Sequence, residues 1–249
     1  MVKKSFTTAL ILTILWVTGA VNMQATESNF NAVNTNSGVL TNTQIIYKNI
    51  QEKTDNELPS WEAFSTAMQG FNNLRKTSDK VKKNIISVVD FSLPSTEKRF
   101  WVIDLDNNEI MFNDYVAHGR NSGNNIANKF SNTPNSNSSS LGFYVTAEKY
   151  HGKHGLSLRL DGMDKGFNDN ARKRAIVLHG AEYANGEFIK KYGRLGRSLG
   201  CPSVPMEIHK NVVNTIYGGS VLLIYSPDEN FRVNSKVLNP DAENAVAQG

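Results

Sequence analysis

Two residues in the last third of the chain have the types needed for nucleophilic catalysis. His179 follows the apolar run Ile176–Leu178 and precedes Gly180, which predicts a histidine at the end of a buried strand. Cys201 follows Gly200 in a glycine-containing turn, where backbone N–H groups can bind an anion. Acyl transfer by cysteine needs a thiolate, an adjacent base and an oxyanion hole. We interpret Cys201 as a candidate nucleophile and His179 as its base.

Cys201 is the only cysteine among 249 residues, so no intrachain disulfide can form. An unpaired cysteine in an exported chain is either reactive or a buried, inert thiol. His179 has the corresponding alternative of an ordinary strand-end histidine. A thiol with a pKa of about 8.5 is mostly protonated at neutral pH. A neighbouring imidazolium would stabilise the thiolate and Arg197 would add positive charge, so we expect Cys201 to react already at about pH 6–7.

The N-terminus has the pattern of an export signal. Two lysines precede the apolar run Ala9–Val17, and small residues follow around Ala20. We expect residues 1–25 to form a signal peptide that is cleaved after Ala20 or Ala25, and the mature chain to lie in the periplasm or cell envelope. The apolar run is too short to span a bilayer, so we expect no stable membrane span after cleavage. An uncleaved anchor is the alternative.

Composition and charge are those of a globular protein, with 39% hydrophobic and 20% charged residues and a net charge of +4. So mild a positive balance indicates no nucleic-acid partner. A zinc site made of His151 and His154 with His179 or His118 is one alternative use of the histidines. No acidic partner stands at a recognisable spacing, so we expect neither a metal nor a cofactor. The oligomeric state is left open.

The remaining segments must position the two candidate residues. We expect an Asn/Ser/Thr-rich linker over 26–58, an N-terminal helical segment over 59–84 with its helix beginning at Ser60, a mainly β catalytic domain over 85–226 and a C-terminal tail over 227–249. Within the domain the pattern predicts a turn at 106–108, a helix over 206–217, and strands at 85–91, 99–105, 109–117, 141–147, 156–160, 174–178 and 221–225.

A long segment rich in Asn and Ser, residues 119–140, separates two of the expected strands. A loop of that length is either disordered or functional. His118, directly before it, could line a cleft or be a plain strand-end residue. Asn132 and Ser140, within it, could hydrogen-bond a peptide backbone or lie on an ordinary polar surface.

The ordered set of these pieces resembles the YkuD-like L,D-transpeptidase family, in its murein L,D-transpeptidase catalytic-domain branch. The family has a strand ending in His-Gly, then a loop, then Ser-x-Gly-Cys. This chain has Leu178-His179-Gly180 and Ser198-Leu199-Gly200-Cys201. Upstream, Gly142-Phe143 matches a Gly-aromatic strand entry, and downstream Gly218-Gly219 matches a glycine turn before a last strand. The resemblance covers residues 85–226.

The resemblance implies a β-sandwich with a preceding N-terminal helix and one helix after the catalytic cysteine. It implies that Cys201 attacks a carbonyl between an L- and a D-centre of a peptidoglycan stem peptide and passes the acyl group to an amine. It further implies that His179 is the base, oriented by a carbonyl near Gly180, and that the N–H groups of Gly200 and Cys201 bind the oxyanion. The substrate-binding residues that we expect are Arg197, Ser198, His118, Asn132 and Ser140.

Two positions depart from the commonest family form, Ser-His-Gly-Cys-x-Arg. Leu199 replaces the histidine and Ser203 replaces the arginine. Arg197 and Arg194 are the candidates to take over the role of that arginine. Two alternatives to transpeptidation stay open: hydrolysis of the same acyl-enzyme, as in an L,D-carboxypeptidase or endopeptidase, and a catalytically silent wall-binding domain.

Overall fold

A computed structural model describes residues 40–240 of the chain. The predicted signal peptide and the first part of the predicted linker lie outside the described residues. Among residues 40–240, no helix has both the length and the apolar character needed to cross a membrane.

The first helix, α1 (Asn42–Lys53), lies inside the segment that the sequence predicted as a linker. A capping box begins it, because the Thr41 side chain accepts from the Gln44 backbone and the Gln44 side chain accepts from the Thr41 backbone N–H. Ile50 is fully buried and packs into the main core. The prediction of a linker is therefore wrong for α1, since a single buried contact and a good cap are enough to order a polar segment against the rest of the fold.

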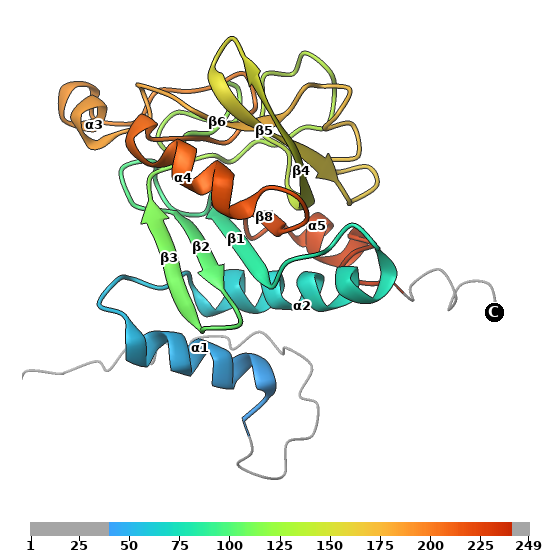
Figure 1. Cartoon of the computed structure of the whole chain (residues 1–249). Helices are drawn as coiled ribbons and strands as arrows, with labels where there is room; N and C mark the ends of the chain where they lie inside the picture. The colour runs from blue at the N-terminus through green and yellow to red at the C-terminus, as the bar shows by residue number, and fades with distance from the viewer. Residues whose placement is uncertain (1–39, 241–249) are drawn as a thin grey trace, which may run out of the picture. The chain divides into compact units, whose positions relative to one another are not determined.

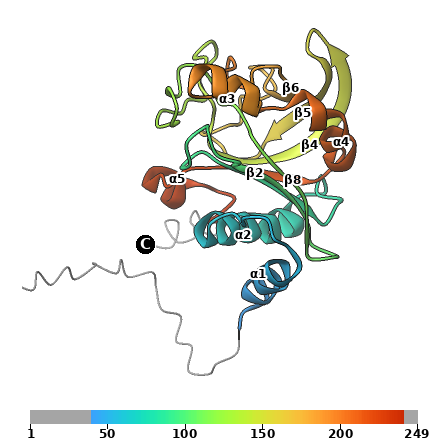
Figure 2. The same cartoon turned by 90° about the vertical axis from the view of Figure 1, so that its left-hand side faces the viewer.

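The second helix, α2 (Trp61–Thr77), begins where the sequence predicted. The Ser60 side chain accepts from the Ala63 N–H and caps its first turn. Its apolar residues recur every three or four positions, so one face buries Phe64, Met68, Phe71 and Leu74. Each such side chain contributes about 1.5–3 kcal/mol on burial. Figure 2 shows α2 below β8, and α2 contacts both β1 and β8.

The strands form one sheet in the order β3-β2-β1-β8-β4-β5-β6-β7 (Figure 1). Their bounds are β1 Ile85–Asp90, β2 Phe100–Asp104, β3 Glu109–Asp114, β4 Gly142–Gly152, β5 Gly155–Gly162, β6 Val177–Gly180, β7 Ser203–Val204 and β8 Val221–Tyr225. The prediction of a mainly β fold with a preceding helix is confirmed. Each expected strand overlaps one of these strands, although β6 begins at Val177 and the sequence predicted a strand over 174–178. The strands are hydrogen-bonded without interruption, so the layers of this fold arise by bending of one sheet.

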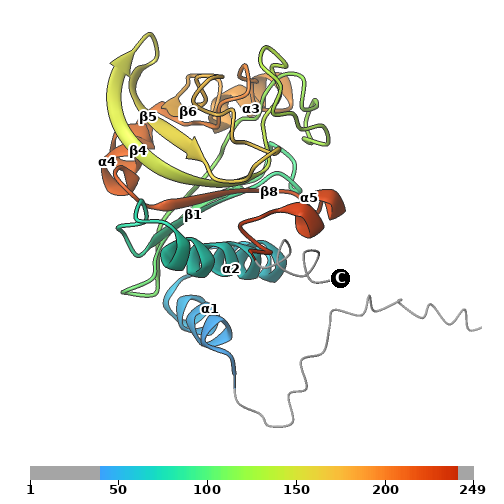
Figure 3. The same cartoon turned by 90° about the vertical axis from the view of Figure 1, so that its right-hand side faces the viewer.

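The long hairpin of β4 and β5 is the strongly curved part of the sheet, as Figure 3 shows. Its register shifts between Thr146 and Lys149, and a bulge of this kind increases twist and bend. The curvature carries the tip of the hairpin, residues 152–155, to the region of β6. The sheet therefore places the β4–β5 turn beside the strand that bears His179.

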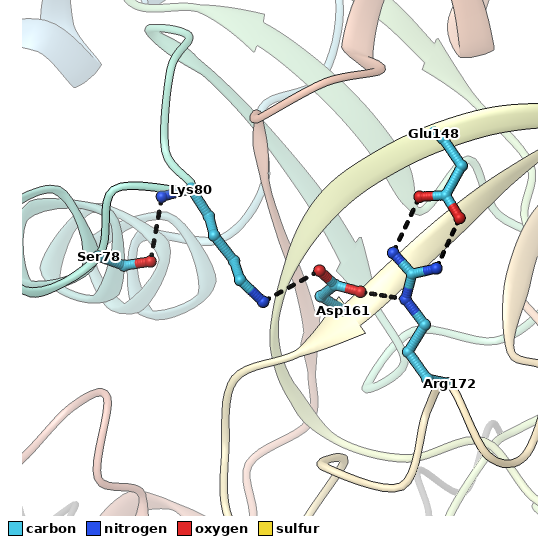
Figure 4. A network of polar contacts seen from close by, with 5 residues as sticks. All are labelled: Ser78, Lys80, Glu148, Asp161 and Arg172. Carbon is cyan, nitrogen blue, oxygen red and sulfur yellow. Dashed lines mark hydrogen bonds and ion pairs between the residues drawn. The ribbon is translucent and has the colours of Figure 1, made fainter.

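A polar network on the surface joins the hairpin to the connection between α2 and β1 (Figure 4). The Arg172 guanidinium bonds both carboxylate oxygens of Glu148 at 2.6 and 2.9 Å and also pairs with Asp161. Lys80 Nζ lies 3.1 Å from the other Asp161 oxygen. These groups are largely exposed, and exposed ion pairs contribute at most about 1 kcal/mol each.

Three helices follow β6: α3 (Gly186–Tyr192), α4 (Met206–Ile216) and α5 (Glu229–Asn234). The helix predicted after the cysteine corresponds to α4. The segment from α5 onward was predicted as a tail with little apolar content, and this is wrong for residues 229–238. Phe231 and Leu238 are buried, and the Ser235 hydroxyl donates to the buried carboxylate of Asp164 at 2.5 Å. Contacts with Phe143 of β4, with Asp164 after β5 and with Gln69 and Asn73 of α2 therefore hold this segment against the domain.

Candidate active site

His179 lies near the end of β6, between two neighbouring strands. It pairs with Ser157 of β5 on one side and with Ser203 of β7 on the other, and its side chain is 3% exposed. The strand is a run of buried apolar residues, as expected for a strand covered on both faces. The imidazole is therefore held by a rigid strand that is paired on both sides, one strand in from the edge of the sheet.

One ring nitrogen of His179 is fixed by the next residue. Nδ1 lies 2.8 Å from the carbonyl oxygen of Gly180, which is the contact that the family resemblance implied. A carbonyl can only accept, so Nδ1 carries the hydrogen and Nε2 is an acceptor in the neutral ring. A Cβ at Gly180 would lie 2.6–2.7 Å from His209 and Met206, so the glycine lets α4 pack against this strand. His209, predicted to be a surface residue, is 2% exposed for the same reason.

The other ring nitrogen of His179 meets a serine. Nε2 lies 3.0 Å from Ser203 Oγ, and Ser203 is fully buried. The Tyr183 hydroxyl lies 3.2 Å from the same oxygen. The sequence drew attention to Ser203 only as a departure from the family form, and it gave no role to Tyr183. Both contacts join residues that are far apart in the chain, so no local pattern could indicate them.

Cys201 lies two residues before the strand partner of His179. It is half-buried, and its thiol donates to the carbonyl oxygen of Ala175 at 3.8 Å. Ala175 has φ 54°, an uncommon conformation for a residue with a Cβ, at the entry to β6. Two residues of strand span about 6.6 Å. Among residues 40–240, no hydrogen bond joins Cys201 Sγ to the His179 ring, and each of the two groups has its own hydrogen-bond partners.

The environment favours the uncharged forms of both groups. Burial raises the pKa of the Cys201 thiol, although the Val177 backbone and the positive charges of Arg174 and Lys153 act in the opposite direction. Burial lowers the pKa of His179, although its hydrogen bond to Gly180 opposes that shift. These directions argue against a thiolate already formed at about pH 6–7 in the substrate-free chain, because desolvation outweighs the nearby charges, and the reactivity of Cys201 at that pH stays a prediction.

The turn before the cysteine is built around Ser198. Its hydroxyl accepts from the Gly200 N–H at 3.0 Å and donates to the Cys201 carbonyl at 2.6 Å. Gly200 has φ 124°, and a Cβ there would lie 2.8 Å from the carbonyl oxygen of Ser138. The Gly200 N–H is thus already bonded, which argues against it as an oxyanion donor in this state. The Cys201 N–H has no acceptor among the described residues and is available for that role.

Arg174 is a site residue that the sequence did not identify as one. It is half-buried beside the cysteine turn, since a Cβ at Gly200 would lie 3.3 Å from Arg174 Nη2. Its guanidinium holds the predicted loop at four points, donating to the carbonyl oxygens of Ser131 and Ser138, both at 2.7 Å, and to the hydroxyls of Ser136 and Ser140. The loop 119–140 is therefore ordered and packed against the cysteine turn.

His118 was expected to line the cleft or to be a plain strand-end residue, and the structure buries it completely. Its Nδ1 accepts from the guanidinium of the equally buried Arg99 at 2.8 Å. Burial, followed by the charge of Arg99, lowers the pKa of His118 to about 4. The neutral imidazole is fully buried, with Arg99 and the Gly123 carbonyl of the loop 119–140 as partners, so it is not accessible to a substrate.

The other predicted substrate-binding side chains hold loops together in the substrate-free chain. Arg197 donates to the carbonyl oxygens of Arg120 and Gly123 at 3.2 and 3.0 Å. Asn132 Nδ2 donates to Asp169 at 2.7 Å, and the Ser140 hydroxyl donates to the Ser131 carbonyl at 2.9 Å. Arg194 bonds the carbonyl of its neighbour Leu195. Direct contact of these side chains with substrate stays a prediction.

The tip of the β4–β5 hairpin covers the base. The exposed ring of His154 stacks on His179 with 4.4 Å between centroids and 18° between planes. Within residues 40–240, no three His, Cys, Asp or Glu side chains are grouped in a way that could hold a metal ion. The arrangement near His179 therefore offers imidazole, thiol and hydroxyl groups, which suit proton transfer and nucleophilic attack.

The sequence was compared with known families and proteins. The family described as the L,D-transpeptidase catalytic domain matches residues 55–225. The matched range includes α2, whereas the predicted catalytic domain began at residue 85. Among curated proteins, none matches this chain.

Several solved structures are similar to this one. An L,D-transpeptidase from Mycobacterium tuberculosis has 13% identity and a TM-score of 0.38, with 58% of each chain covered. One from Mycobacterium smegmatis has 12% identity and a TM-score of 0.36, with 58% of this chain and 59% of that chain covered. A mutant of the Enterococcus faecium L,D-transpeptidase has 11% identity and a TM-score of 0.36, with 58% and 50% covered. The chain thus spans less than two thirds of the length of these relatives.

Proposed function

The chain belongs to the L,D-transpeptidase catalytic domain family, and on this premise we propose that it is an exported cysteine acyltransferase of peptidoglycan stem peptides. The observation that carries the proposal is the placement of the two candidate residues. His179 is fixed at Nδ1 by the Gly180 carbonyl, and Cys201 lies two residues from the strand partner of His179. A base with one defined lone pair, and a half-buried thiol on the turn that leads into the neighbouring strand, are the components that nucleophilic catalysis requires.

The proposed reaction begins with proton transfer from the Cys201 thiol to Nε2 of His179. The sulfur attacks the carbonyl between an L- and a D-centre of the stem, and the Cys201 N–H donates to the developing oxyanion. The bond to the leaving amine breaks, and that amine takes the proton from His179. A thioester at Cys201 remains. The amine of a second stem attacks the thioester carbonyl and gives a proton to Nε2 of His179, the C–S bond breaks as the cross-link forms, and the Cys201 sulfur takes that proton back from His179.

Electrostatics near the sulfur support this order of events. Arg174 and Lys153 both lower the pKa of the thiol, while burial raises it. In a substrate-free site the burial effect is the larger one. The thiol would therefore give its proton to His179 during the attack itself, with Arg174 and Lys153 stabilising the negative charge on the sulfur.

We also propose the placement and partners that follow from this activity. The mature chain would begin between residues 21 and 26, act in the periplasm or cell envelope, and meet its stem peptides there. The helix α2 would belong to the catalytic unit, because it shares one core with β1, β8 and β4. Finding an intact N-terminal methionine on exported material by mass spectrometry would contradict the cleavage proposal.

The experiment that tests the function uses the mature chain with muropeptides that carry tetrapeptide stems, and separates the products by chromatography and mass spectrometry. Cross-linked dimers in the wild type, and none with Cys201→Ala, are the expected result. Trimmed stems without dimers would make the chain an L,D-carboxypeptidase. No change in either sample would favour a wall-binding domain. Activity retained by Cys201→Ala would overturn the proposed nucleophile.

A further inference from the structure

We propose that Ser203, supported by Tyr183, is a positioning residue that holds His179 by its Nε2 atom in the substrate-free enzyme and keeps the base apart from the Cys201 thiol. The proposal rests on the roles proposed above for Cys201 and His179. It assigns a function to the position where the commonest family form has an arginine and this chain has a serine.

The geometry defines a directed chain of hydrogen bonds. His179 Nδ1 donates to the Gly180 carbonyl, so Nε2 of the neutral ring must accept. The Ser203 hydroxyl, 3.0 Å away, is therefore the donor to Nε2. The Tyr183 hydroxyl, 3.2 Å from Ser203 Oγ, can then donate to that oxygen. The donors and acceptors are therefore all assigned: Tyr183 donates to Ser203, Ser203 donates to His179, and His179 donates to Gly180.

This series of hydrogen bonds engages Nε2 of His179, the atom that catalysis needs. Nε2 is the nitrogen that would take the thiol proton, and it is bonded to Ser203 while the thiol is bonded to the Ala175 carbonyl. A donor to the lone pair of a neutral imidazole disfavours the imidazolium. To accept from an imidazolium, the Ser203 hydroxyl must turn its hydrogen elsewhere, for example to the Cys201 carbonyl at 3.5 Å, which is a weak hydrogen bond. Ser203 therefore favours the neutral pair.

Other charged or titratable groups also face this pair, and the test must separate them from Ser203. His154 and Lys153 reach His179 from the β4–β5 hairpin, and His209 faces it from α4. Arg174 acts on the thiol from the turn before β6, with Lys153 on the same side. None of these groups is changed by a substitution at position 203, so a change in reactivity there reports on the hydroxyl.

The chain makes the measurement simple, because Cys201 is its only cysteine and iodoacetamide can label no other thiol. We would measure the labelling rate against pH for the wild type and for Ser203→Ala. Loss of the hydroxyl frees Nε2 for the thiol and raises the pKa of His179, so the labelling midpoint should move to lower pH by about one unit, which is about tenfold faster labelling at pH 7. Tyr183→Phe, which loses only the support to Ser203, should shift the midpoint less and in the same direction.

Matched variants keep the result specific. Ser157→Ala removes a buried serine on the other strand that pairs with His179. Among the described residues its hydroxyl bonds only to the Gly155 carbonyl, so the midpoint should stay unchanged. Ser203→Thr keeps the hydroxyl and should resemble the wild type. Titration of the His179 ring by NMR gives an independent measurement, with its pKa expected to rise in Ser203→Ala.

The proposal is overturned if the midpoint of Ser203→Ala is unchanged or moves to higher pH, or if Ser157→Ala shifts it equally. A shift that persists when Ser203→Ala is combined with His179→Ala would also overturn it, because the serine would then act without the imidazole. None of these outcomes depends on peptidoglycan. Dimer formation by the wild type would therefore still support the proposed function if this inference failed.

Discussion

The guanidinium of Arg174 donates to the carbonyl oxygen of Ser138 over 2.7 Å. That same carbonyl lies against Gly200, directly before the candidate nucleophile. One arginine therefore links the loop 119–140 to the cysteine turn, and its charge lowers the pKa of the Cys201 thiol. The residue joins the packing of the site to its electrostatics.

We expect Arg174→Ala to lower both the stability of the protein and the reactivity of the Cys201 thiol. It removes four hydrogen bonds to the loop, all of them to residues that are half-buried or buried, and such charge-assisted bonds are worth about 1.5–3 kcal/mol when made. We predict a loss of about 2–4 kcal/mol in the free energy of unfolding, measured by urea denaturation. We also predict slower alkylation of Cys201 at a fixed pH, because the thiol loses a positive neighbour.

Arg172→Ala is the matched control, two residues away on the same turn. Its ion pairs with Glu148 and Asp161 are on the surface, so the expected loss is below about 1 kcal/mol. Arg174→Lys keeps the charge without the planar fork, and should recover the alkylation rate more than the stability. Equal losses of stability in Arg174→Ala and Arg172→Ala would show that Arg174 does not hold the loop.

Much of the fold could be predicted because its main elements are locally encoded. The β-branched runs that become β1 and β8, the cap at Ser60 and the three-and-four spacing of α2 are all readable in short windows. The helix α1 was missed because its sequence is polar and a single residue, Ile50, is fully buried. The two-residue strand β7 was missed because only its pairing with β6 defines it.

The site was predictable only in its motif residues. The types and order of His179, Gly180 and Cys201 are enough to indicate the chemistry. The partners Ser203 and Tyr183 meet the imidazole through pairing and loop packing, which leave no local signal. His118 was misjudged because a strand-end histidine looks the same whether it faces a cleft or, as here, the buried guanidinium of Arg99.

His118 should make stability depend on acidity. The folded protein holds its pKa at about 4, while the unfolded chain titrates near 6.5, so the unfolded chain binds more protons between these values. The contribution of His118 is complete above pH 6.5 and falls as the pH drops to 4, by about 3 kcal/mol in all. Urea denaturation at several pH values in this window measures it.

The variant His118→Asn separates the contribution of His118 to the pH dependence of stability from the contribution of the buried carboxyl groups. Its side-chain oxygen can take the place of Nδ1 as acceptor for Arg99, and it does not titrate. We expect a lower stability than the wild type at pH 7 and a flatter dependence between pH 4 and 6.5. Parallel curves for the two proteins across that window would mean that His118 is not held neutral by the fold.

Restoring the residues of the commonest family form should have different effects on stability at positions 199 and 203. Leu199 is 56% exposed, so Leu199→His should change the free energy of unfolding by less than about 0.5 kcal/mol. Ser203 is fully buried against His179, so Ser203→Arg must bury a cation and should cost more than about 3 kcal/mol. Thermal or urea denaturation compares them, and a stable Ser203→Arg would contradict the enclosed position of this residue.

The central claim is that Cys201 forms the acyl-enzyme, and the mass of the intact protein tests it most directly. The mature chain would be mixed with a tetrapeptide stem or, in a second sample, with a carbapenem as acyl donor, quenched with acid and weighed. We predict a mass increase equal to the acyl group, located at Cys201 by peptide mapping, slowed by His179→Ala and absent from Cys201→Ala. The account would be contradicted if the wild type acquired no adduct from either donor, or if Cys201→Ala acquired the same one.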